Sequence, residues 1–243
     1  MVVKEIVDFV CVLTFEGSNG NMLSSDDIKS LLEYLDLLEA DDDVCGVILT
    51  GRGRSFSAGL ESFSVAGSFN KEMSDCFFYT FDRLLIRLFS FPKPVVAAVN
   101  GHSIGGGLLL QCCADFVYIA DNEKIKLGFP EFKMGLTIDL LMQVVLNFSI
   151  NNSKVLSHLL YSSEYFGIQK SLDYGLVDRI VPLDSLMALS FSHLKAIAVN
   201  NKSAFAITKQ LTKSDCVKKM QNALSEKCYC ILTELLTEKY CEK

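Results

Sequence analysis

The sequence KPVVAAVNGHSIGGG, residues 93–107, decides the fold class of this chain. Its apolar run, Val95–Val99, is typical of a buried strand, and the apolar residues 108–113 that follow it predict a helix. Four glycines lie between these two elements. Glycine lets the backbone approach a ligand closely, and a helix start favours negative charge. The stretch therefore predicts a strand, a tight turn and a helix start that can bind a negatively charged group.

The chain around this stretch alternates between strand and helix patterns. A capping signal at Ser24 predicts a helix with one apolar face, and residues 71–90 predict another helix. The chain after residue 137 is mostly helical. Further strands are predicted at residues 5–15, 45–50, 116–120, 125–128 and 178–181. Strand and helix alternation followed by helices predicts an α/β fold.

The glycine-rich turn is compatible with a dinucleotide site. Gly101 and Gly106 fit the outer positions of G-x-G-x-x-G, and Asp121 lies at a suitable distance further on. Ser103 replaces the middle glycine, however, and the pattern lies in the middle of the chain. These two departures count against this interpretation.

The same turn also matches the nucleophile elbow of serine hydrolases. Residues 101–105 read GHSIG, which fits G-x-S-x-G with Ser103 as the nucleophile. Such a serine needs a histidine later in the chain, and His158 and His193 are the only two. Both lie in helical stretches instead of in a loop after a strand, which counts against a hydrolase.

Four segments carry patterns that belong together. They are residues 93–107 with Cys-Ala-Asp at 113–115, RSFSAGLE at 54–61, FPE at 129–131 with Gly-Leu at 135–136, and GLVDRIVP at 175–182. In this order they resemble the signatures of the crotonase (enoyl-CoA hydratase/isomerase) superfamily. Two positions depart from the family patterns, because Glu61 stands where aspartate is usual and Ser171 where alanine is usual.

The resemblance covers nearly the whole chain and implies its architecture. We expect a crotonase-like spiral of repeated ββα units with a C-terminal helical region. Residues 1–195 are expected to form the spiral core, and residues 196–243 a helical region for oligomerisation. The family resemblance also implies homotrimers or hexamers, with the C-terminal helices at the subunit contacts.

The resemblance further implies an oxyanion hole for an acyl thioester. The backbone N–H groups of Leu60 and Gly106 are expected to hold the thioester oxygen as negative charge develops on it. Glu131 is expected to be the catalytic proton carrier. Further substrate contacts are expected from Ala58, Gly59, Gly105 and Leu109.

Leu109 decides which activity the resemblance favours. Hydratases of this family use two glutamates, and Leu109 occupies the position of the first, while Glu131 occupies that of the second. Leucine can neither activate water nor give a proton. Moving a double bond from position 3 to position 2 needs only one carboxylate. The pattern therefore favours a 3,2-enoyl-CoA isomerase.

Other activities of the superfamily stay open as alternatives. They are dienoyl-CoA isomerase, enoyl-CoA hydratase, and thioester hydrolase, decarboxylase or C–C bond lyase on a carrier-bound acyl group. A non-catalytic acyl-CoA binding protein is a further alternative from a different class. Asp139, eight residues after Glu131, is a second candidate catalytic acid, because dienoyl-CoA isomerases and 3-hydroxyisobutyryl-CoA hydrolases carry an acid there. Its alternative role is that of a residue at the start of a helix.

The remaining candidate residues form three sets. Lys209 is a candidate for the adenosine end of coenzyme A, because that end needs local positive charge. Asp115 is expected to be a structural turn residue, and Glu61 an acid in a loop. An apolar helical face, which belongs either to the core or to an acyl pocket, comprises Phe77, Phe78, Phe81, Leu84 and Leu85.

Composition limits the partners of the chain. Half of its 243 residues are hydrophobic, which permits a sizeable core, and its net charge of −6 argues against nucleic acid as a partner. The nine cysteines show neither disulfide nor metal-ligand spacing, so we expect buried thiols in a reducing compartment. No signal peptide or membrane span is evident, and a cytoplasmic protein is expected. Its expected partner is an acyl-CoA or acyl-carrier substrate, without a metal or a further cofactor.

Overall fold

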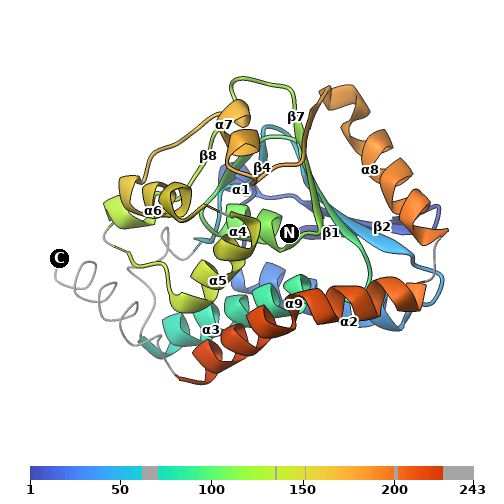
Figure 1. Ribbon diagram of the computed structural model, residues 1–243, viewed down its shortest axis with the longest axis horizontal. Coiled ribbons are helices and arrows are strands. Elements are labelled where there is room, and N and C mark those ends of the chain that lie inside the picture. Colours follow the sequence, from blue (N-terminus) through green and yellow to red (C-terminus); the bar gives the residue numbers. More distant parts are fainter. Residues whose placement is uncertain (62–70, 135, 151, 200–201, 227–243) are drawn as a thin grey trace.

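A twisted six-stranded sheet forms the centre of the molecule (Figure 1). The computed structural model describes residues 1–61, 71–134, 136–150, 152–199 and 202–226. The sheet has the order β1-β2-β3-β5-β7-β9; β1 and β2 are antiparallel, and all other neighbours are parallel. Its strands are β1 (Val2–Val7), β2 (Val10–Phe15), β3 (Gly46–Gly51), β5 (Val95–Val99), β7 (Phe116–Ala120) and β9 (Arg179–Val181).

A second, smaller sheet lies at the carboxyl ends of the main strands. It consists of three parallel strands, β4 (Ser55–Ser57), β6 (His102–Ile104) and β8 (Leu127–Gly128). Each of these strands follows a strand of the main sheet and precedes a helix. The helices of these units are α3 (Lys71–Phe89), α4 (Gly106–Cys113) and, after the 3₁₀ helix η2 (Glu131–Met134), α5 (Leu140–Ser149). The expected spiral of ββα units is thereby confirmed.

Helices cover the main sheet and extend the spiral. Figure 1 shows α8 (Leu183–Ala198) along one side of the sheet and a layer of α2 (Ser25–Ala40), α3 and α9 (Lys202–Ser225) on another. Helix α9 packs across α3 and α5. The other helices of the described residues are α1 (Ser18–Asn21), α6 (Ser153–Ser162) and α7 (Ile168–Asp173).

Local sequence signals account for the predicted elements. The Ser24 side chain accepts from the Asp27 N–H and the Asp27 carboxylate accepts from the Ser24 N–H, a capping box that fixes the start of α2. Strand β5 is buried along its whole length, as expected for the interior of a parallel sheet. The helices predicted from Ser24 and over residues 71–90 are confirmed, as is the short strand within 125–128.

Some short elements were not predicted from the sequence. Residues 2–15 form a hairpin, β1–β2, where one strand was predicted over residues 5–15, and its turn places Asp8 and Phe9 at φ of +48° and +67°. Both values match the turn type that two-residue hairpins favour, although Asn-Gly is its usual sequence. Strands β4 and β6, helix α1 and the 3₁₀ helix η2 were not predicted either, and β6 lies in the segment that the sequence predicted as a tight turn.

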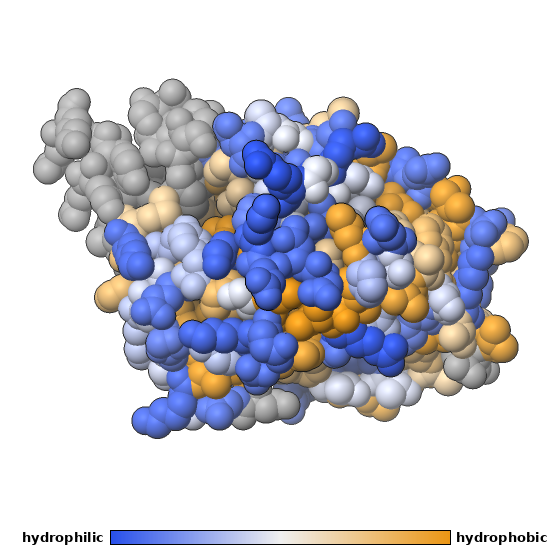
Figure 2. All heavy atoms as spheres, turned by 90° about the horizontal axis from the view of Figure 1, so that it is seen from above, coloured by the Kyte–Doolittle hydropathy of each residue, from blue (hydrophilic) through white to orange (hydrophobic). Residues whose placement is uncertain are grey.

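The surface mixes polar and apolar residues. Figure 2 looks onto the side that carries α7 and α8 in Figure 1, and shows hydrophilic side chains interspersed with apolar ones. No helix among the described residues is both long enough and apolar enough to cross a membrane. The boundary at residue 195, the trimer or hexamer and the cytoplasmic location stay predictions, and residues 227–243 lie outside the described part.

Candidate active site

Two glycine-bearing loops meet between the small sheet and α4. A Cβ atom on Gly59 would lie 3.1 Å from the Ile104 carbonyl oxygen and 3.4 Å from the Gly106 nitrogen. A Cβ atom on Gly106 would lie 3.0 Å from Leu60 Cγ. Gly59 also has a φ of +101°, which side chains other than glycine rarely adopt. Glycine at these positions therefore lets the two loops touch.

The two expected oxyanion donors lie on these loops. Gly106 is the first residue of α4, so its N–H has no acceptor within the helix. Around Leu60, the Gly59 carbonyl accepts from the Leu23 N–H and the Glu61 N–H donates to the Leu23 carbonyl, so the Leu60 N–H points away from this ladder. Neither N–H has an acceptor within the part of the chain that the structure describes. Both are therefore available to an oxygen atom of a substrate.

The Glu131 carboxyl group lies against the second of these loops. It begins η2, and its Oε1 is 2.5 Å from the place where a Cβ atom on Gly105 would stand. Its Oε2 is buried and has no hydrogen-bond partner among the described residues. Burial raises the pKa of Glu131 from 4.5 to about 7. This carboxyl group can therefore exchange a proton near neutral pH.

A narrow cavity of about 30 Å³ joins these groups. Glu131 is the only ionisable side chain among the described residues that line it, and Leu109, which is 2% exposed, is part of its apolar wall. Two aromatic residues of α3 also face the cavity, so part of the apolar face predicted there belongs to the pocket. The lining residues are Leu60, Phe78, Phe81, Gly106, Leu109, Glu131, Leu136, Thr137 and Met142.

Met142 and Thr137 are lining residues that the sequence did not indicate. Met142 lies in the first turn of α5, and Thr137 lies in the segment between η2 and α5. Neither belongs to a pattern that marked the site. Gly135, the glycine of the P-E-x-x-x-G-L pattern, lies outside the described residues.

The other three predicted substrate contacts lie within two residues of Leu60 or Gly106 in the chain. Ala58, Gly59 and Gly105 do not line the cavity. The Ala58 N–H donates to the Gly20 carbonyl, and the Gly105 N–H donates to the Gly128 carbonyl. In this structure the three residues shape the two loops through their backbones. Direct contact between their atoms and a substrate stays a prediction.

Asp139 has a structural role in this geometry. It is the N-cap of α5, and its Oδ1 accepts from the Met142 N–H at 2.9 Å. Burial raises its pKa above the ordinary value, but Asp139 is not among the residues that line the cavity with Glu131. The structure therefore favours the helix-start alternative for Asp139.

Neither alternative use of the glycine-rich turn is assembled. Ser103 Oγ is fully buried and has no hydrogen-bond partner among the described residues. His193 bonds to the Tyr118 hydroxyl, and His158 faces Glu164 at 3.7 Å, so neither forms a triad with Ser103. Strand β6 also separates Gly101 from the start of α4, which removes the direct strand-to-helix turn of a dinucleotide site. No cluster of metal-ligand side chains occurs among the described residues.

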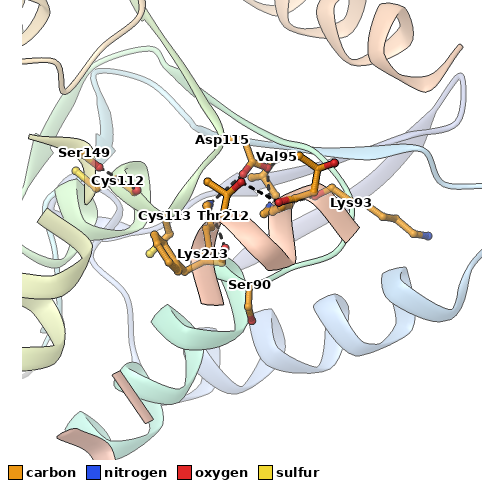
Figure 3. A network of polar contacts seen from close by, with 12 residues as sticks. Ser90, Lys93, Val95, Cys112, Cys113, Asp115, Ser149, Thr212 and Lys213 are labelled. Atoms are coloured by element: carbon orange, nitrogen blue, oxygen red, sulfur yellow. Dashed lines mark hydrogen bonds and ion pairs between the residues drawn. The ribbon is translucent and has the colours of Figure 1, made fainter. Parts of the chain in front are cut away.

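Lys209 is not available to coenzyme A, which corrects the sequence prediction. It is buried in the interior, and its Nζ lies 2.6 Å from Asp115 Oδ2. Lys213, one helical turn further along α9, lies 3.0 Å from Asp115 Oδ1 (Figure 3). Asp115 also accepts from the Val95 N–H, as expected of a structural residue. Burial lowers the pKa of Lys209 to about 8, although Asp115 opposes this shift.

Glu131→Gln is expected to remove a pH-dependent loss of stability. Folding raises the pKa of Glu131 above its ordinary value, so the contribution of this group is fully present below about pH 4.5 and is lost as the pH rises through about 7. The difference between these two values corresponds to about 3 kcal/mol. At pH 8 the free energy of unfolding of the variant should exceed the wild-type value by up to this amount.

Urea denaturation of both proteins between pH 4 and pH 8 measures this effect. Asp139, whose pKa is also raised, is present in both proteins and cancels in the comparison. A difference in stability that does not widen as the pH rises would contradict a raised pKa at Glu131.

Comparison with known proteins identifies the fold and the family. The structure resembles that of an enoyl-CoA hydratase from Bacillus halodurans with a TM-score of 0.87, at 22% identity, covering 98% of this chain and 96% of that one. The fold is therefore the crotonase fold. A family model described as enoyl-CoA hydratase/isomerase matches residues 5–235. The chain belongs to the enoyl-CoA hydratase/isomerase family.

Sequence relatives in this family carry two kinds of name. A Thermus thermophilus protein provisionally named as an enoyl-CoA hydratase is 34% identical over 196 residues, 79% of this chain and 75% of that protein. The mitochondrial enoyl-CoA delta isomerase 1 of Rattus norvegicus is 30% identical over 218 residues, 88% of this chain and 72% of that protein. The chain spans 63% to 75% of the lengths of these two proteins and of two further relatives that are named as hydratases. The names thus do not separate hydratase from isomerase.

Proposed function

We propose that this chain is a 3,2-enoyl-CoA isomerase. The observation that carries the proposal is one carboxyl group, that of Glu131, in an apolar cavity beside two N–H groups without acceptors among the described residues; its Oε2 is buried and has no hydrogen-bond partner among them. Leu109 occupies the cavity wall where a hydratase would place its other glutamate. One proton carrier and one oxyanion site are what the movement of a double bond requires.

The proposed mechanism moves one proton. The Glu131 carboxylate removes a proton from C2 of a 3-enoyl thioester, and the electron pair delocalises onto the thioester oxygen. The N–H groups of Leu60 and Gly106 stabilise this dienolate, aided by the positive end of α4. Glu131 then returns the proton to C4, the double bond lies between C2 and C3, and the thioester carbonyl is restored.

Enoyl-CoA hydratase is the second candidate, because relatives of this chain carry that name. Hydration needs a positioned water molecule and, in this family, usually two acid/base groups. Glu131 is the only ionisable group of the described cavity lining, and Leu109 cannot hold water in a catalytic position. These observations support the isomerase over the hydratase.

An assay with four substrates tests the proposal. Purified protein is incubated with 3-enoyl-, 2-enoyl-, 3,5-dienoyl- and 3-hydroxyacyl-CoA, and the products are identified by mass spectrometry and ultraviolet absorbance. We expect conversion of 3-enoyl-CoA to 2-enoyl-CoA with no change in mass. Faster formation of 3-hydroxyacyl-CoA from 2-enoyl-CoA would instead establish a hydratase, and binding without turnover would establish the non-catalytic alternative.

A further inference from the structure

The segment before α2 has a strained backbone. Asn19, Gly20 and Asn21 have φ angles of +54°, +81° and +61° in succession. A left-handed conformation is unfavourable for a residue other than glycine, although asparagine tolerates it better than most residues. Strain of this kind persists only where the surrounding structure holds it, and it often occurs at functional sites.

The Asn21 side chain supplies contacts that hold this segment. It is 4% exposed, and its Nδ2 donates to the Ser55 carbonyl at 2.7 Å and to the Arg52 carbonyl at 2.9 Å. Its Oδ1 accepts from the Gly17 N–H at 3.1 Å. The strained segment is therefore tied to β4, the strand that leads into the loop that bears Leu60. In Figure 1, α1 lies beside β4.

Backbone hydrogen bonds join the strained segment and Leu23 to the loop that bears Leu60. The Ala58 N–H donates to the Gly20 carbonyl at 2.9 Å, and the Leu23 N–H donates to the Gly59 carbonyl at 2.8 Å. The Glu61 N–H donates to the Leu23 carbonyl at 3.0 Å. These three bonds fix the backbone on both sides of Leu60, which leaves the Leu60 N–H on the opposite side.

Ser57 links the strained segment to Gly59, the residue before Leu60. Its hydroxyl is fully buried, donates to the Asn21 carbonyl at 2.9 Å and accepts from the Gly59 N–H at 3.2 Å. Gly59 has the positive φ that turns the chain into Leu60. One hydroxyl group therefore joins the strained segment to the bend that orients the oxyanion donor.

We propose that Asn21 and Ser57 are positioning residues that set the direction of the Leu60 N–H in the oxyanion hole. Neither residue lines the cavity, so each acts through the backbone of residues 58–60. The inference rests on the proposed function, since it assumes an acyl-thioester oxygen at Leu60 and Gly106. It adds that the direction of the Leu60 N–H depends on two residues outside the cavity lining, one of which, Asn21, lies far before Leu60 in the sequence.

Binding of an enolate tests the inference without turnover. A 3-ketoacyl-CoA is used as the probe, because its enolate places negative charge on the thioester oxygen and absorbs in the near ultraviolet. The readout is the enolate ratio, which is the affinity for this enolate divided by the affinity for the saturated acyl-CoA of equal length. Ser57→Ala should lower this ratio about tenfold, less than the 10²–10³ that removal of a donor costs in other enzymes.

Ser190→Ala is the matched control. Ser190 is also fully buried and also donates to a backbone carbonyl, that of Leu186, but it lies within α8. The control should lose similar stability in urea denaturation and keep the enolate ratio within about twofold. Asn21→Gly, which accepts the left-handed backbone but lacks the side chain, should lower the ratio as Ser57→Ala does.

Turnover distinguishes the outcomes. Both variants should lower kcat for 3-enoyl-CoA with little change in KM or in the pH midpoint, because Glu131 lies on another element. Equal effects of Ser57→Ala and Ser190→Ala on the enolate ratio would overturn the inference, as would a wild-type protein without enolate preference. A wild-type protein that prefers the enolate but does not isomerise 3-enoyl-CoA would refute the isomerase proposal alone, and the Ser57→Ala ratio would still decide the inference.

Discussion

Glu131→Gln is expected to lower kcat for 3-enoyl-CoA by about 10²–10⁴-fold, the range that a positioned general base contributes. Glutamine has the same size and can fill the space beside Gly105, but it can neither remove the C2 proton nor return one to C4. The cavity lining described here offers no second ionisable group that could take over the proton transfer. Initial rates at saturating substrate, followed by the absorbance of the conjugated product, measure the loss.

The matched control for this prediction is Asp139→Asn. Asparagine keeps the side-chain oxygen that caps α5 and removes a carboxylate whose pKa is raised by burial, so the variant should be at least as stable as the wild type at neutral pH. If Glu131 acts alone, this variant keeps kcat within about threefold of the wild type, whereas a second catalytic acid would make the loss about 10²-fold or more. Both variants should bind a saturated acyl-CoA as the wild type does. If the Glu131→Gln variant kept more than about a tenth of the wild-type rate, Glu131 would have no part in the proton transfer.

Strong local patterns made much of the fold predictable. Val95–Val99 has only small and β-branched apolar residues, and the Ser24 cap precedes an apolar helical stripe. The missed elements carry weak or atypical signals. Strands β4 and β6 are three residues long, β6 lies directly between Gly101 and Gly105, and the β1–β2 turn contains Asp8-Phe9 instead of Asn-Gly. Such short pairings depend on contacts between distant segments, which local patterns do not encode.

The candidate site was predictable where a motif fixes the backbone. Leu60, Gly106 and Glu131 were placed by glycine and proline patterns, and the structure brings them to one cavity. Side chains whose role depends on burial were harder to place. Asp139 has the spacing of a second acid, but its use as an N-cap depends on where α5 begins.

The role of the Lys209 charge also depends on burial. The sequence displays a positive residue in a helix, and the helix packing decides that this residue faces inward. Helix α9 has its apolar residues spread around its axis, so no amphipathic stripe predicted which face would dock. The docking face became evident only from the partners of Lys209 and Lys213.

Asp115→Asn is expected to lower the free energy of unfolding by about 3–5 kcal/mol, the cost of leaving buried charge without its counter-ion. Asp115 is the common partner of Lys209 and Lys213, which are 7% and 5% exposed. Asparagine can still accept from the Val95 N–H, so the loss reports the charge and not the backbone contact. Urea denaturation at pH 7, followed by circular dichroism, measures the change.

Two controls separate burial from charge pairing. Asp8→Asn removes a carboxylate that pairs with Lys195 on the surface at 2.9 Å, where the Asp8 side chain is 70% exposed, and should cost less than about 1 kcal/mol. Lys213→Met leaves a one-to-one pair between Asp115 and Lys209, and its apolar side chain can occupy the space against Phe89, whose ring centre lies 4.2 Å from Lys213 Nζ. This variant should be near neutral or more stable, because a well-packed apolar group often replaces a buried charge without loss. If Asp115→Asn cost no more than Asp8→Asn, the two lysines would have to reach water or another anion in solution, and the charge network would not be what holds α9 against α3 and α5.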